Sequence, residues 1–145
     1  MDMGSGRSLL QETVERVLPL IPRERLFVVT ASEVADAVVE NLGDWPEENL
    51  LVEPEGRNTA ACVAWGTMEI ARRVGVADMV IAVMPADHSI QDEAAFRQTI
   101  QDCGQAALST NAIVTVGIQP TRPETGFGYI RLGGAHGTWG ESEFR

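Results

Sequence analysis

Two kinds of hydrophobic pattern alternate along the chain. In four segments, apolar residues recur every three or four positions, which is the spacing of one face of an α-helix. Between them lie short runs of nearly continuous apolar residues, which indicate buried strands. We expect helices over about 8–18, 32–43, 60–74 and 92–103, and strands over 26–30, 49–53, 79–84, 112–118 and, more weakly, 127–132.

Local signals mark several helix ends. Ser8 precedes a glutamine three positions later, which is the spacing of a capping box. Asn58 and Thr59 are both good N-cap residues for the third helix. Gly43 and Gly75 stand where helices commonly end in a left-handed residue.

The alternation of strands and helices predicts an α/β fold of the doubly wound, Rossmann-like kind. Parallel strands need crossover helices and bury both faces, so we expect a three-layer α/β/α arrangement around a mostly parallel sheet. The 145 residues suit a single domain, and 44% of them are hydrophobic. Because such domains normally open with a strand and this chain opens with a helix, we expect the first strand of the sheet to be missing.

The charge balance narrows the possible partners. Twenty-one acidic residues against eleven basic ones give a net charge of -10, and all the basic residues are arginine. A nonspecific grip on nucleic acid needs a basic patch, so we expect no nucleic-acid partner. No apolar run approaches the roughly 20 residues of a membrane-spanning helix, so we expect no membrane contact. Cys62 and Cys103 show no metal-type spacing, and reduced thiols in a cytoplasmic protein are the simplest interpretation.

Ligands of open parallel sheets bind beyond the carboxyl ends of the strands. That rule selects a first loop (residues 53–61), a second loop (83–89) and a third loop (120–130). In the first loop, Gly56 permits close approach of the backbone to a ligand and Arg57 offers a planar cation to phosphate or a base edge. The alternative is that Arg57 pairs with Glu53 or Glu55 above an ordinary helix cap.

The second loop follows the most apolar run and contains Asp87 and His88. A carboxylate at the tip of a buried strand is well placed to hold Mg²⁺, which prefers one or two carboxylates with water and phosphate oxygens. His88 then orders the surroundings or touches the substrate. The alternative makes Asp87 a turn residue that caps the next helix, with His88 merely packed.

In the third loop, Gly126 and Gly128 flank Phe127, so the backbone can lie against a flat, hydroxyl-rich ligand such as a sugar. Glu124 can accept hydrogen bonds from hydroxyls. The alternative is a simple bend that leads into an edge strand.

In chain order, the three loops read Glu-Pro-Glu-Gly-Arg-Asn-Thr-Ala, Pro-Ala-Asp-His and Pro-Thr-Arg-Pro-Glu-Thr-Gly-Phe-Gly-Tyr-Ile. Together they closely resemble the bacterial mannose-1-phosphate guanylyltransferases of the sugar nucleotidyltransferase family, from about Gly6 to Leu132. The resemblance implies the fold of that family and the formation of GDP-mannose and pyrophosphate from GTP and mannose 1-phosphate, with Mg²⁺ as cofactor.

The resemblance also implies roles for individual residues. Asp87 matches the metal-binding, catalytic aspartate, and His88 lies beside it at the substrate. The residues that match the region around the guanine nucleotide are Glu53, Gly56, Arg57, Asn58, Thr59 and Ala60. Those that fall in the loop around the mannosyl unit are Glu124, Gly126 and Tyr129.

The chain departs from the family pattern in two motifs. It contains neither the glycine-rich signature loop, Gly-x-Gly-Thr-Arg-Leu-x-Pro-Leu with its lysine, nor the Glu-Lys-Pro motif. We therefore expect a partial nucleotidyltransferase domain over 7–145, preceded by a leader outside the family over 1–6. The alternative function is a noncatalytic nucleotide-sugar binding or regulatory module. Strand edges left unpaired by a missing first strand favour homo-oligomers.

Overall fold

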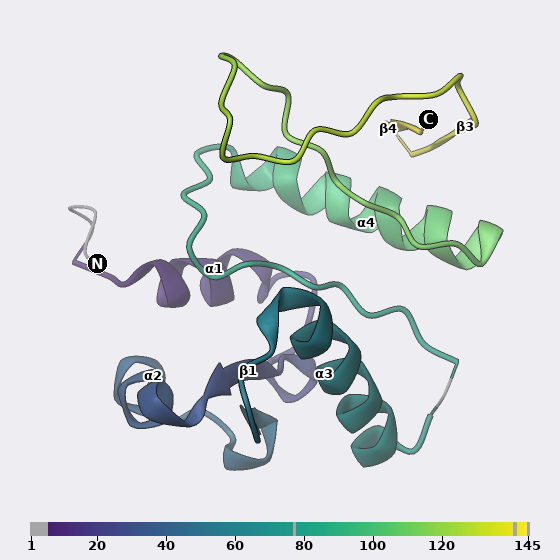
Figure 1. Ribbon diagram of the computed structural model, residues 1–145. Coiled ribbons are helices and arrows are strands. Elements are labelled where there is room, and N and C mark those ends of the chain that lie inside the picture. Colours follow the sequence, from purple (N-terminus) through teal and green to yellow (C-terminus); the bar gives the residue numbers. More distant parts are fainter. Residues whose placement is uncertain (1–5, 77, 141, 145) are drawn as a thin grey trace. The chain divides into compact units, whose positions relative to one another are not determined.

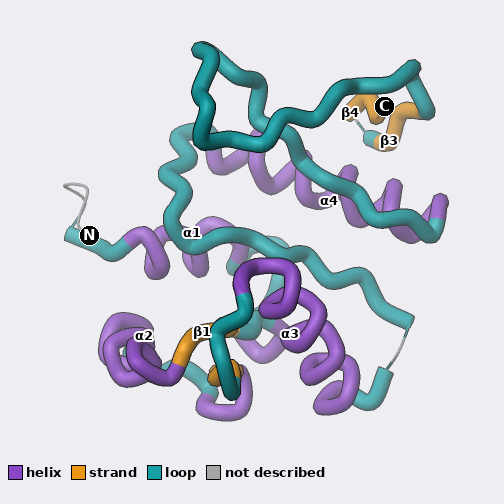
Figure 2. Tube along the Cα trace, viewed as in Figure 1, coloured by secondary structure: helices purple, strands orange, loops and turns teal. Residues whose placement is uncertain are grey.

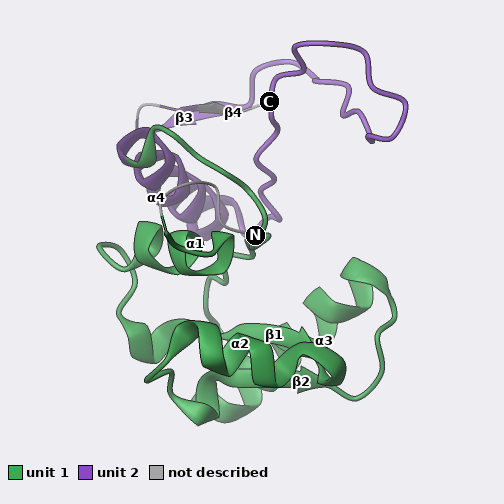
Figure 3. Ribbon diagram, turned by 90° about the vertical axis from the view of Figure 1, so that its left-hand side faces the viewer, with its two compact units in different colours: residues 1–93 green, residues 94–145 purple. Residues whose placement is uncertain are grey.

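The computed structural model describes residues 6–76, 78–140 and 142–144 (Figure 1). The chain divides into two compact units, unit 1 over residues 1–93 and unit 2 over residues 94–145 (Figure 3). Of the leader expected at 1–6, all but Gly6 lies outside the described residues. None of the described helices is long and apolar enough to cross a membrane.

The described residues of unit 1 form three α-helices and two strands. They are α1 (Leu9–Val17), β1 (Val28–Ala31), α2 (Ala35–Leu42), β2 (Leu50–Glu53) and α3 (Asn58–Val74), with short 3₁₀ helices at Arg23–Arg25, Ser32–Val34 and Glu47–Asn49. The three helices and two of the three strands expected in this part of the sequence are thereby confirmed, although the second helix begins with a 3₁₀ turn.

The helix ends follow the local signals in most cases. The Ser8 side chain accepts a hydrogen bond from the Gln11 amide at 3.2 Å, while the Gln11 side chain accepts one from the Ser8 amide at 2.8 Å. Gly75 ends α3 in the left-handed conformation at φ 72°. The expected cap of α3 is wrong, because Arg57 occupies the N-cap position and Asn58 is already the first helical residue.

The two strands of unit 1 pair in parallel, with Val28 opposite Leu50 and Ala31 opposite Glu53. Leu51 is fully buried. The helices α2 and α3 lie on either side of the strand pair (Figure 2). A Cβ added at Gly66 of α3 would lie 3.1 Å from Val29 Cγ2, so glycine allows α3 to pack closely on β1. This part of the chain is an α/β arrangement of helix, parallel strands and helix.

The strands expected at 79–84, 112–118 and 127–132 do not form, and these segments are irregular. Their apolar side chains are exposed, with 58% of Val83 and 79% of Ile118 accessible to solvent. A nearly continuous apolar strand is stable when neighbours pair with it and helices cover both its faces. In the described parts of the chain the parallel sheet ends at β1 and β2, so these runs have no strand beside them.

Unit 2 holds the fourth helix and a hairpin. Helix α4 spans Glu93–Thr110, close to the expected start at Asp92, and an antiparallel hairpin joins β3 (Gly137–Trp139) to β4 (Ser142–Phe144). The hairpin is attached to α4 through Asp102, a buried carboxylate that accepts hydrogen bonds from Gln98 at 2.8 Å and Ser142 at 2.7 Å. The hydrophobic pattern did not predict this hairpin.

Candidate functional site

The first loop leaves the carboxyl end of β2 and enters α3. Since β1 and β2 are parallel, both carboxyl ends meet at this edge of the strand pair. Arg57 and Glu55 form an ion pair at 2.8 Å, with 70% and 68% of their side chains exposed. The alternative expectation that Arg57 pairs with an adjacent glutamate is therefore confirmed for Glu55.

The first turn of α3 presents Asn58, Thr59 and Ala60 to solvent. No side chain caps this turn, and it contains no acidic residue. Uncapped amides at a helix N-terminus carry a partial positive charge, which favours an anionic group. Gly56, immediately before Arg57, is exposed, and a Cβ there would meet nothing within 4 Å. The loop is open to an oxygen-rich ligand.

Glu53, at the end of β2, has a neighbour that motif reasoning missed. Partial burial, and then the charge of Glu53 and a hydrogen bond to it, raise the pKa of the Cys62 thiol. Cys62 lies on the second turn of α3 and is free, as is Cys103. The sequence offered one signal for this pair, namely a cysteine near the start of a helix that follows a strand ending in glutamate. The thiol therefore stays protonated at neutral pH.

The second loop exposes its carboxylate. Asp87 lies in a turn with 82% of its side chain exposed, and His88 Nε2 lies 3.9 Å from Asp87 Oδ1. The Asp87 turn stands well before α4, so the expectation that Asp87 caps the next helix is wrong. The His88 carbonyl accepts a hydrogen bond at 3.3 Å from the guanidinium of Arg16, a residue of α1 that sequence motifs did not single out.

A divalent ion at this loop would need ligands besides Asp87. Among the described residues, no group of three or more His, Cys, Asp or Glu side chains is arranged to hold a metal. Mg²⁺ commonly takes one or two carboxylates and completes its shell with water and substrate phosphates. The exposed Asp87 carboxylate fits that role as a single protein ligand.

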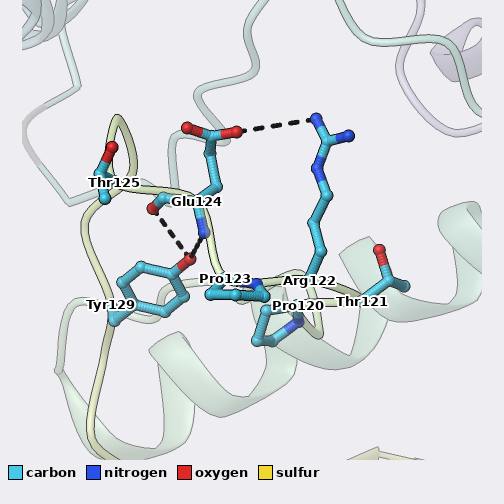
Figure 4. A pocket seen from close by; sticks show the side chains of 7 residues that line it. All are labelled: Pro120, Thr121, Arg122, Pro123, Glu124, Thr125 and Tyr129. Atoms are coloured by element: carbon cyan, nitrogen blue, oxygen red, sulfur yellow. Dashed lines mark hydrogen bonds and ion pairs between the residues drawn. The ribbon is translucent and has the colours of Figure 1, made fainter.

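The third loop folds onto itself around Glu124. Tyr129 Oη accepts a hydrogen bond from the Glu124 amide at 2.7 Å and donates one to the Glu124 carbonyl at 2.9 Å (Figure 4). Glu124 Oε1 accepts from the Gly126 amide at 3.3 Å, and Arg122 lies 3.7 Å from the other oxygen. The loop surrounds an open pocket of about 480 Å³, lined by Pro120, Thr121, Arg122, Pro123, Glu124, Thr125 and Tyr129.

The structure therefore brings together Glu124, Gly126 and Tyr129, and the loop is a closed bend rather than the entry to a strand. The first and second loops belong to unit 1 and the third to unit 2. Within the described part of unit 1, no hydrogen bond or ion pair joins the first loop to Asp87 or His88. Convergence of the three loops over one ligand stays a prediction.

The model of the nucleotidyl transferase family matches residues 1–140. The chain belongs to the nucleotidyl transferase family. A xanthan biosynthesis protein, XanB, of Xanthomonas campestris pv. campestris (strain B100) is 37% identical over 139 residues, which cover 94% of this chain and 29% of that relative. A mannose-1-phosphate guanylyltransferase of Salmonella montevideo is 36% identical over 92% of this chain and 27% of its own length. No solved structure matches the chain significantly.

A further relative of this chain, the mannose-1-phosphate guanylyltransferase of Escherichia coli (strain K12), is 43% identical over 86 residues, which cover 59% of this chain and 18% of the relative. The chain thus spans less than a third of the length of these relatives. The expected resemblance is confirmed, as is the α/β class, by the family and by the helices on either side of the parallel strands.

Proposed function

We propose that this chain carries part of the core of a mannose-1-phosphate guanylyltransferase, which forms GDP-mannose and pyrophosphate from GTP and mannose 1-phosphate. The supporting observation is that a relative with this name aligns with 92% of the chain, which is nearly all of the sequence that contains the three loops. An oxygen of mannose 1-phosphate attacks the α-phosphorus of GTP. The bond between the α-phosphorus and the oxygen that bridges it to the β-phosphorus breaks, and pyrophosphate leaves.

The first loop binds the nucleotide in this proposal. A chain with a net charge of -10 repels polyphosphates at long range, so local cations must compensate. The Arg57 ion pair is well exposed, and exposed pairs contribute only about 0–1 kcal/mol. The guanidinium can therefore exchange Glu55 for a nucleotide phosphate or base edge at little cost. The uncapped amides of Asn58, Thr59 and Ala60 add positive potential beside it.

The third loop binds the mannosyl phosphate in this proposal. Its pocket of about 480 Å³ has the size of small-ligand sites, which are clefts of about 300–1,000 Å³. Glu124 offers a carboxylate for sugar hydroxyls, and its backbone is fixed by Tyr129 Oη. Arg122 stands at the same pocket with 76% of its side chain exposed. A carboxylate and a cation at one pocket suit a ligand that carries both hydroxyls and a phosphate.

Asp87 holds Mg²⁺ in this proposal, and His88 lies beside it at the substrate. When bound, the ion neutralises the charge that develops on the phosphate oxygens during transfer. The protein has no nucleophile to supply, because phosphoryl transfer depends mainly on positioning and electrostatics. Free thiols at Cys62 and Cys103 suit a cytoplasmic location, where disulfides are rare.

A second function, binding of a nucleotide sugar without transfer, is favoured by one observation. The sequence contains eleven arginines and no lysine, so none of these 145 residues offers a lysine ammonium to a phosphate. A binding module keeps the first and third loops in use and needs no transfer chemistry.

One experiment separates the two functions. The chain is incubated with GTP, mannose 1-phosphate and Mg²⁺, and pyrophosphate release is measured; calorimetry with GDP-mannose measures binding. Transfer predicts pyrophosphate that is lost in Asp87→Asn and retained in Asp44→Asn, an exposed control in the same unit. Binding without pyrophosphate supports the module. A chain that neither releases pyrophosphate nor binds GDP-mannose contradicts both proposals.

A further inference from the structure

We propose that Arg16 is a positioning residue that fixes the second loop and thereby holds the Asp87 carboxylate where a divalent ion can use it. The metal part of this inference rests on the proposed function of Asp87, whereas the anchoring of the loop does not.

Arg16 is an unusual residue to find buried. Helix α1 turns Thr13, Arg16 and Val17 inward, at the spacing of one helical face, and only 2% of Arg16 is exposed. Burial of a guanidinium is costly unless its N–H groups find acceptors. One of those acceptors is the His88 carbonyl, 3.3 Å from Arg16 Nη2 and 72 positions away along the chain.

Residues 79–91, the segment that contains the His88 carbonyl, have few other contacts that fix their position. Residues 79–91 contain no described helix or strand, and the strand expected at 79–84 does not form. Within the described chain, the bond from Arg16 is the one side-chain hydrogen bond that joins this segment to another part of unit 1. A loop without backbone pairing depends on such a contact for a defined position.

Asp87 lies between Ala86 and the bound carbonyl of His88. On one side, Ala86 borders an open pocket of about 300 Å³ that residues of α1 and α2 also line, among them Leu10 and Val38. On the other side, the His88 carbonyl is bound by Arg16. The Asp87 side chain itself is exposed. The backbone beside Asp87 is thus held by Arg16, while the carboxylate points to solvent, as a metal ligand requires before the ion arrives.

The chemistry of the donor favours arginine at this position. A charged donor strengthens a hydrogen bond to a carbonyl, and the planar guanidinium can bond several acceptors at once. Lysine keeps the charge and loses the fork, whereas methionine keeps the approximate length and loses every donor. Arg16→Lys should therefore retain part of the anchoring and Arg16→Met none.

The test uses the full chain as wild type, Arg16→Lys, Arg16→Met and the control Arg23→Met. Arg23 also donates to a backbone carbonyl in unit 1, that of Asp44 at 3.2 Å. Arg23→Met therefore removes the same kind of hydrogen bond at a place away from the second loop. Cleavage by thermolysin, which cuts beside apolar residues, is followed without ligand by mass spectrometry. We expect cleavage within 79–92 to be about tenfold faster in Arg16→Met, the factor expected for losing a bond to a charged donor, intermediate in Arg16→Lys and unchanged in Arg23→Met.

The second measurement is the affinity for Mn²⁺ in the presence of GTP, read from the electron paramagnetic resonance signal of free Mn²⁺. Support is a weaker affinity in Arg16→Met with partial recovery in Arg16→Lys, while the affinity for GTP alone stays constant. Unchanged cleavage within 79–92 in Arg16→Met, or an Mn²⁺ affinity equal to wild type, overturns the proposal. If wild type and Asp87→Asn bind Mn²⁺ equally, the proposed metal role of Asp87 fails instead, and the cleavage data alone judge the anchoring.

Discussion

Leu51 and Val52 are neighbours in β2 and offer a direct test of how the strand pair is covered. Leu51 is fully buried, whereas 40% of Val52 is exposed. Leu51→Ala removes buried carbon atoms and leaves a cavity, so we expect a loss of about 3–5 kcal/mol in the free energy of unfolding. Val52→Ala removes two methyl groups that are partly in water already, so we expect a loss of about 1 kcal/mol.

The assay is urea unfolding followed by tryptophan fluorescence in a Trp139→Phe background. The remaining signal then comes from Trp45 and Trp65, which both lie in unit 1. Since domains are stable by only about 5–15 kcal/mol, the Leu51 variant should have a markedly lower midpoint with an unchanged slope. Equal losses for the two variants would mean that both faces of β2 are covered alike, and the reasoning from burial would be refuted.

Three further predictions concern the hairpin, the third loop and Cys62. Gly140→Ala places a Cβ over the Asp102 carboxylate at a residue with φ 59°, so hydrogen exchange over 137–144 should rise by tenfold or more; unchanged exchange contradicts the close approach. Tyr129→Phe removes the hydroxyl that closes the third loop and should weaken mannose 1-phosphate binding in calorimetry several-fold; equal affinity contradicts the loop's role. Burial raises the pKa of the Cys62 thiol, so the protonated thiol contributes to the stability of the folded chain at lower pH, and this contribution is lost as pH rises through the raised pKa. Cys62→Ala should therefore flatten the decline of the unfolding midpoint at alkaline pH. An unchanged decline contradicts this reasoning.

Signals that act within a few residues were sufficient for the helices. The capping box at Ser8 formed as the spacing predicted, and Gly75 took the left-handed conformation that ends α3. These features depend on hydrogen bonds between residues three or four positions apart, so the sequence specifies them without knowledge of the tertiary structure. The cap of α3 is the exception, since Arg57 and not Asn58 precedes the helix.

Strand formation could be predicted only where a partner strand exists. The runs at 26–30 and 49–53 pair with each other and became β1 and β2. The run at 79–84 is at least as apolar, yet no strand lies beside it in the described chain. Apolar composition indicates which segments are stabilised by burial, whereas strand pairing depends on residues distant in the sequence.

The sequence by itself determined the α/β class, the helices and the three loops whose residues match the family. The tertiary structure decided which of those residues have partners: Tyr129 closes the third loop on Glu124, burial and Glu53 raise the pKa of Cys62, and Arg16 reaches the second loop across 72 positions. The physical reason is the distance along the sequence over which each interaction acts. Helix periodicity and caps are local, whereas a buried arginine meets its carbonyl only after helix α1 and the second loop have come together in unit 1.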